Sequence, residues 1–170
     1  MTPPAAVSLR PALDAVARAV DARFDRLLDV PDDARARLFE GMRHATIGGG
    51  KKMRALLTVA ACDLFHVDRE RALRVALAIE AVHSYSLVHE ATAVLTGDSL
   101  FALAFEVLAD PLTHEDPFVR SELVLELARA SGPHGMAGGQ MMDLEAEQAS
   151  FDLATTTRLQ QLKTGALIAF

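Results

Sequence analysis

Residues 48–54 read Gly-Gly-Gly-Lys-Lys-Met-Arg, and the chain is organised around this stretch because three glycines meet three cations there. The segments on either side, 35–45 and 55–61, read as helices. Glycines between two helices let the backbone bend and let a ligand approach closely. The N–H groups at the start of the second helix suit an anion, and Lys51 and Arg54, three residues apart, are expected to share one helix face. The stretch therefore predicts a phosphate or diphosphate site, and the alternative is a glycine-terminated helix followed by a solvated basic turn.

Composition limits the class of protein. The 170 residues suffice for one domain with a sizeable core, and 51% of them are apolar. A net charge of -6 gives no reason to expect nucleic acid as a partner. The one cysteine, Cys62, excludes an internal disulfide and is typical of a reducing cytoplasm. No apolar run approaches the length of a membrane span, so we expect a cytoplasmic protein without one.

Helical spacing of apolar residues runs through the whole chain. It predicts helices over 8–28, 34–44, 53–65, 71–89, 92–109, 118–130, 136–148 and 153–170, and no strand. The nearly uncharged segment 53–65 is expected to lie deep in the core, and the apolar segment 75–82 predicts a central helix. We expect an all-α fold, with one domain over residues 1–170 that is a bundle of long, largely buried antiparallel helices.

Histidine and lysine spacing excludes two common kinds of site. Gly50-Lys51 is followed by Lys52 in place of Ser or Thr, and a helix precedes it, so the stretch does not fit a nucleotide P-loop. His83 and His89 lie six residues apart, which is not the spacing of a helical metal pair. His83 is either a half-buried histidine with a local partner or a hydrogen-bond donor to an anion held by Lys51 and Arg54.

Two further polar groups follow near the end of the chain. Gln140, Asp143 and Glu147 share one helix face, where they can hold a cation, position water, form a polar surface or pair with a basic neighbour. Lys163-Thr164 interrupts an apolar helix, and it either reaches the surface or provides a second anion contact. Two separate cationic clusters together predict a ligand with two phosphate-bearing ends.

Five segments in this order resemble the trans-isoprenyl diphosphate synthases, the polyprenyl synthetase family, and most of all its short-chain bacterial farnesyl or geranyl diphosphate synthases. They are GGKKMR at 49–54, EAVHSYSLVH at 80–89, LTGDSL at 95–100, GGQMMDL at 138–144 and KTGAL at 163–167. Any one of these motifs is weak, but their order makes the resemblance specific, and it covers the chain from about residue 38 to the end.

The resemblance implies an all-α homodimer that condenses isopentenyl diphosphate with an allylic diphosphate to a trans-prenyl diphosphate of ten to fifteen carbons. It also implies Mg²⁺, which bridges the allylic diphosphate to aspartates and stabilises the leaving group. No residue of this chain corresponds to a catalytic group or a metal ligand. The corresponding substrate contacts are Lys51, Arg54 and His83 for isopentenyl diphosphate and Lys163 and Thr164 for the allylic diphosphate, while Gln140 and Asp143 correspond to positions that line the cavity.

Two departures concern the aspartates. The first aspartate-rich motif of the family should begin directly after His89, where this chain continues with Glu90, and the second should lie beyond Phe170. We therefore expect the sequence to be incomplete, with a loop absent between residues 89 and 90 and helices absent after 170. If aspartates followed His89, Tyr85 would stand just over one turn before them and form the floor of the product cavity.

Two alternatives to the enzyme stay open on the sequence. One is a non-catalytic, prenyl-synthase-like regulatory subunit that lacks the aspartate-rich motifs and modifies a catalytic partner. The other, with the resemblance set aside, is a helical protein with an anion site and no chemistry.

Overall fold

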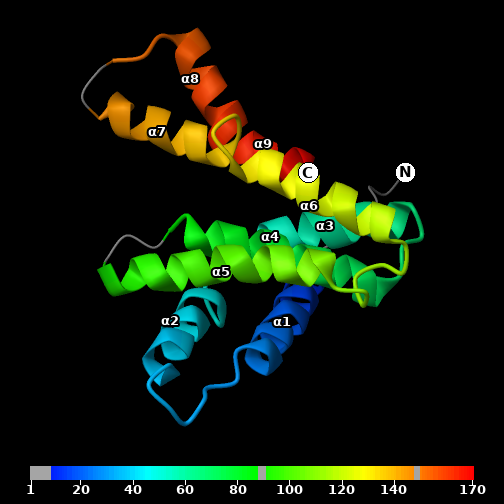
Figure 1. Ribbon diagram of the computed structural model, residues 1–170. Coiled ribbons are helices and arrows are strands. Elements are labelled where there is room, and N and C mark those ends of the chain that lie inside the picture. Colours follow the sequence, from blue (N-terminus) through cyan, green and yellow to red (C-terminus); the bar gives the residue numbers. More distant parts are fainter. Residues whose placement is uncertain (1–8, 88–90, 148–149) are drawn as a thin grey trace. The chain divides into compact units, whose positions relative to one another are not determined.

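The computed structural model describes residues 9–87, 91–147 and 150–170, and at 91–93 the backbone alone (Figure 1). Its helices are α1 Arg10–Leu27, α2 Ala36–Thr46, α3 Met53–Leu64, α4 Arg69–Tyr85, α5 Ala91–Ala109, α6 Pro117–Ser131, α7 Met136–Ala146, α8 Leu153–Gln160, the π-helical segment η1 Gln161–Gly165 and α9 Ala166–Ala169. No strand occurs within these described ranges, and the all-α prediction is confirmed. The chain divides into two compact units, Met1–Phe101 and Ala102–Phe170. The expectation of one incomplete domain stays a prediction.

Among the helices whose first residues the structure describes, three begin at an aspartate whose carboxylate accepts hydrogen bonds from the first turn. Asp68 opens α4, Asp116 opens α6 and Asp152 opens α8. These side chains satisfy N–H groups that have no partner inside the helix. Pro117 follows Asp116 at the first position of α6, where its missing N–H costs nothing.

The core of the first unit is built around α4. Ten of the residues between Ala72 and Ser84 of this helix are buried. This burial confirms the prediction of a central helix over 75–82. The first helix, α1, contributes Val16, Val20 and Phe24, which lie one turn apart and form a single apolar stripe. Helices α1 and α3 both pack against α4.

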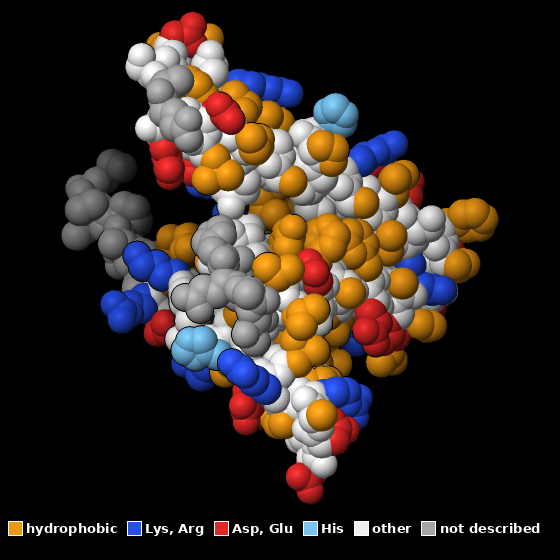
Figure 2. Space-filling model, turned by 60° about the vertical axis from the view of Figure 1, so that its left-hand side comes forward, with side chains coloured by type: hydrophobic (Ala, Val, Ile, Leu, Met, Phe, Trp, Pro, Cys, Tyr) orange, Lys and Arg blue, Asp and Glu red, His pale blue; other side chains and the backbone are white. Residues whose placement is uncertain are grey.

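The third helix is less buried than its composition predicts. Only Ala55 and Val59 are buried, whereas Leu57 is 47% exposed and Leu64 is 78% exposed. The prediction that 53–65 lies deep in the core is therefore wrong. An uncharged sequence does not define which face is covered, and here only the stripe through Ala55 and Val59 is buried. Figure 2 shows one face of the molecule on which hydrophobic side chains reach the surface in many places.

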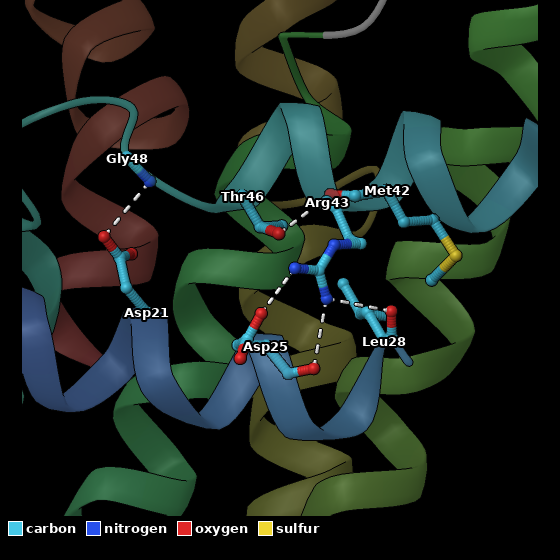
Figure 3. A network of polar contacts seen from close by, with 7 residues as sticks. All are labelled: Asp21, Asp25, Leu28, Met42, Arg43, Thr46 and Gly48. Carbon is cyan, nitrogen blue, oxygen red and sulfur yellow. Dashed lines mark hydrogen bonds and ion pairs between the residues drawn. The ribbon is translucent and has the colours of Figure 1, made fainter. Parts of the chain in front are cut away.

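Arg43 of α2 ties α2 to the end of α1 (Figure 3). Its guanidinium donates to the backbone carbonyls of Asp25 and Leu28, at 3.1 and 3.2 Å, and to the carboxylate of Asp25. A cation at the C-terminus of a helix satisfies carbonyls that lack an intrahelical partner. The contact joins α2 to the C-terminal turn of α1.

In the second unit α7 lies against η1 and α8, and α6 packs against α7 and α9. The approach of α7 to η1 is close at Gly139, where an added Cβ atom would lie 2.5 Å from the Cα atom of Lys163. Only glycine fits between the two backbones there. Within the described residues, no helix combines the length and the apolar character that crossing a membrane requires.

Candidate functional site

The glycine stretch 48–54, hereafter the basic turn, owes its shape to three residues in the left-handed region. These are Gly48, Gly50 and Lys52, with φ of 72°, 67° and 49°. Helix α3 therefore begins only at Met53, and Lys51 lies before it. The prediction that Lys51 and Arg54 share a helix face is wrong, because the three-residue rule holds only within a helix. Lys51 is exposed and Arg54 is half-buried.

Lys52 is directed inward. Its side chain is 4% exposed, and its ammonium donates to the carbonyl of Thr46 at 2.5 Å and lies 3.6 Å from the Asp21 carboxylate. The ammonium also lies over the ring of Phe24, 5.9 Å from its centroid. The sequence pattern does not predict this role, because nothing in the stretch itself distinguishes Lys52 from Lys51.

Glu80 of α4 contacts the first turn of α3. Its carboxylate, in a residue that is 4% exposed, accepts a hydrogen bond of 3.0 Å from the Ala55 N–H group. Burial raises the pKa of Glu80, and the Ala55 N–H and the charges of Lys52 and Arg54 oppose that rise. The expectation that the first N–H groups of α3 are open to an anion therefore fails at Ala55, whose partner is a carboxylate of the protein itself.

His83 lies three residues after Glu80 and so shares its face of α4. Burial, followed by the positive charges of Arg54 and Lys52, lowers the pKa of His83 to about 4. The imidazole is therefore neutral at pH 7 and offers one N–H donor. The Nε atom of Arg54 is buried, and no hydrogen-bond partner for it lies among the described residues. Arg54 thus lies near enough to His83 for its charge to act on the imidazole, and its Nε–H group is a buried donor without a partner among the described residues.

The second predicted cluster lies in η1. Lys163 donates to the carboxylate of Asp143 on α7 at 2.6 Å, and the two side chains are 34% and 47% exposed. Thr164 is half-buried beside it. Of the alternatives for the polar row on α7, the structure shows a basic neighbour for Asp143, while Glu147 already lies beyond the last residue of the helix. A π-helical segment is rare and is frequent at functional sites.

The two clusters belong to different units of the chain. Lys51, Arg54 and His83 lie in the first unit, and Lys163 and Thr164 lie in the second. That one ligand pair uses both clusters stays a prediction. The junction of residues 89 and 90, where a missing loop is expected, lies outside the described residues.

Tyr85 ends α4 and packs against α5. Its ring lies 5.0 Å from the ring of Phe101, at an angle of 45°. A Cβ atom added at Gly97 would lie 3.0 Å from the Tyr85 ring, so the absent side chain at 97 makes room for the tyrosine. A bulky side chain at this end of α4 is therefore held from one side by α5.

Comparisons with known proteins agree on one family. Residues 35–91 match the model of the polyprenyl synthetase family. The farnesyl diphosphate synthase of Escherichia coli (strain K12) is 35% identical over an alignment 153 positions long, which covers 76% of this chain and 51% of that protein. The solved structure of an FPP/GFPP synthase from Zymomonas mobilis is 51% identical with a TM-score of 0.91, over 94% of this chain and 66% of that one. A geranyltransferase structure from Legionella pneumophila is 30% identical with a TM-score of 0.84, over 93% and 64%.

The chain covers only part of the length of its relatives. The chain spans about half the length of the curated relatives it matches, 43% and 51% for two of them. Within the part that the structure describes, no three His, Cys, Asp or Glu side chains are grouped so that they can hold a metal ion.

Proposed function

The chain belongs to the polyprenyl synthetase family, and on that premise we propose that the protein is a prenyl transferase. It condenses isopentenyl diphosphate with an allylic diphosphate and forms a trans-prenyl diphosphate of ten to fifteen carbons. The observation that carries the proposal is the buried Nε–H group of Arg54, which has no partner among the described residues and belongs to a guanidinium whose charge acts on His83. Such a donor suits an anionic ligand.

Each cluster has a part in substrate binding. Arg54 and Lys51 pair with the diphosphate of isopentenyl diphosphate, and His83 donates its ring N–H to the same group. Lys163 and Thr164 hold the allylic diphosphate with an ammonium and a hydroxyl donor. Cationic donors around the departing diphosphate stabilise the charge that develops on it.

Magnesium does not fit the residues that the structure describes. The family holds the ion through aspartate-rich motifs, and the described residues contain no group of carboxylates of that kind. We therefore assign no step to a metal ion. We further propose that the protein is a homodimer and that it is located in the cytoplasm.

The decisive experiment is a condensation assay with isopentenyl and dimethylallyl diphosphates in a magnesium-containing buffer. We expect Arg54→Ala to lower kcat/KM about 100-fold, because a cation paired with a diphosphate is lost. The matched control is Arg35→Ala, whose guanidinium is exposed and pairs with Asp33. Equal kinetics for Arg54→Ala and Arg35→Ala would refute the assigned role. A wild-type protein without turnover that binds a separate synthase chain would support the regulatory subunit instead.

Product length gives a second test. Tyr85 is a bulky residue braced by Phe101 at the end of α4, and we propose that it ends the product cavity. Replacing Tyr85 with Ala opens that end, so longer prenyl diphosphates are expected by chromatography of the dephosphorylated products. Phe118→Ala, at a residue that is 80% exposed, serves as the control. An unchanged product distribution in Tyr85→Ala would contradict the assignment.

A further inference from the structure

We propose that Asp21 and Lys52 are positioning residues that hold the basic turn in the shape required by the isopentenyl diphosphate site. The inference rests on the function proposed above, and it concerns two residues that are not among the proposed substrate contacts. Asp21 lies on α1, outside the part of the chain that carries the family motifs.

One carboxylate spans the turn. Oδ2 of Asp21 accepts a hydrogen bond of 3.1 Å from the Gly48 N–H group, which Figure 3 shows. Oδ1 of the same side chain lies 3.6 Å from the ammonium of Lys52. Gly48 and Lys52 are the first and the last left-handed residues of the turn. Asp21 therefore joins its two ends across Gly49, Gly50 and Lys51.

The backbone of the turn needs such contacts. A left-handed conformation is open to glycine, but for lysine it is unfavourable and persists only where the surroundings hold it. Lys52 is held by the Thr46 carbonyl, the Asp21 carboxylate and the Phe24 ring, which come from α2 and α1. With Lys52 fixed inward, its neighbours Lys51 and Arg54 are left for a ligand.

The Asp21–Lys52 pair is electrostatic and asymmetric. Oδ1 of Asp21 is buried and has no hydrogen-bond partner within the described residues, so the ammonium at 3.6 Å is its compensating charge. Removing that ammonium leaves a buried anionic oxygen without compensation, which strongly favours rearrangement of the turn. Glu80 stabilises the other side of the junction through Ala55 and does not replace this contact.

Asp25 provides a matched control. It lies one turn further along α1, and its carboxylate also pairs with a cation, Arg43 of α2. Asp21→Asn and Asp25→Asn therefore each remove one carboxylate charge from the same face of the same helix. Only the first of them touches the basic turn.

The kinetic test compares Asp21→Asn, Lys52→Met and their double variant with Asp25→Asn in the condensation assay. We expect each single variant to raise KM for isopentenyl diphosphate about tenfold with kcat within about twofold, because the turn loses order while the ligand contacts remain. The KM of the double variant should not exceed that of the more impaired single variant, since the two residues act through each other. Lys52→Arg keeps the charge and should hold KM within about threefold of wild type. Equal KM in Asp21→Asn and Asp25→Asn, or additive effects in the double variant, would overturn the proposal.

A second measurement needs no substrate and separates this inference from the proposed function. Amide hydrogen exchange across residues 48–51 of the ligand-free protein should be at least about tenfold faster in Asp21→Asn and Lys52→Met than in wild type and Asp25→Asn. Faster exchange in a protein without turnover would refute the enzyme and retain the positioning role. Unchanged exchange would refute the positioning role whatever the activity.

Discussion

The basic turn and the Lys163 segment hold their cations in opposite ways. In the basic turn one cation, Lys52, is buried and neutralised by Asp21, while Lys51 stays exposed. In η1 the single lysine is itself the cation paired with a carboxylate, and both partners are partly exposed. Under the proposed function, the first region separates the structural charge from the charges left for a ligand, and the second uses one charge for both.

Backbone geometry differs between the two regions in the same sense. The basic turn is loose around its middle glycine, since a Cβ atom added at Gly49 would meet nothing within 4 Å. The Lys163 segment is tight, because Gly139 of α7 lies against the backbone of Lys163. We infer that side-chain charges order the first region and that backbone packing orders the second.

Alanine at the two glycines gives the largest expected difference. Gly139→Ala places a methyl group inside the α7–η1 contact and should lower the free energy of unfolding by about 2–3 kcal/mol. Gly49→Ala meets open space at an ordinary φ and should change it by less than about 0.5 kcal/mol. Urea denaturation followed by circular dichroism measures both.

One result for these two alanine variants would contradict the contrast between the two regions. Equal destabilisation by Gly49→Ala and Gly139→Ala would show that the basic turn is packed as tightly as η1. The contrast between charge ordering and backbone packing would then be lost.

Asp143 gives a smaller expected effect. If Lys163 serves both Asp143 and a diphosphate, Asp143→Asn frees the ammonium and should tighten binding of inorganic diphosphate about threefold. Isothermal titration calorimetry measures the affinity. Stability should fall by no more than about 1 kcal/mol, because the pair is partly exposed.

Two controls accompany Asp143→Asn. Glu126→Gln breaks the exposed Glu126–Arg129 pair on α6 and should leave the affinity unchanged. In a Lys163→Met background, Asp143→Asn should have no effect. A weaker affinity in the single variant would mean that Asp143 orients Lys163 and does not compete with the ligand.

Much of the fold could be predicted because helical periodicity records which face is buried. The central helix α4 was predictable from residues 75–82, whose apolar positions cover almost every side. The burial of α3 was not, because an uncharged helix carries no contrast between faces. Leu57 and Leu64 are exposed, although the composition of α3 is that of a core helix.

The candidate site was predictable in its residue types and not in its orientations. Lys51 and Lys52 are chemically equal in sequence, and their opposite roles follow from one positive φ at Lys52. Asp21 has no motif around it, and its contact with Gly48 joins residues 27 apart. The pairing of Asp143 with Lys163 likewise depends on how α7 meets η1.

The smallest expected effect concerns the protonation of His83 and its contribution to stability near the basic turn. The pKa of His83 is about 4 in the folded protein against an ordinary value of 6.5, chiefly because the ring is buried. The unfolded chain therefore binds the proton first as the pH falls. Stability from this residue is complete above pH 6.5 and is lost as the pH drops toward 4. His83→Gln removes the titration, so the stability of wild type relative to this variant should fall by about 0.5 kcal/mol from pH 7.5 to pH 5, after allowance for solvent screening of a half-buried ring.

Urea denaturation at the two pH values measures this difference, and His44→Gln, at an exposed histidine of α2, is the control. A stability difference between wild type and His83→Gln that does not change with pH would show that His83 keeps its ordinary pKa beside Arg54 and Lys52. The basic turn would then gain a further positive charge on acidification. A difference that falls as expected means that His83 is a neutral donor beside the basic turn, so that the charge proposed to bind the diphosphate comes from Lys51 and Arg54.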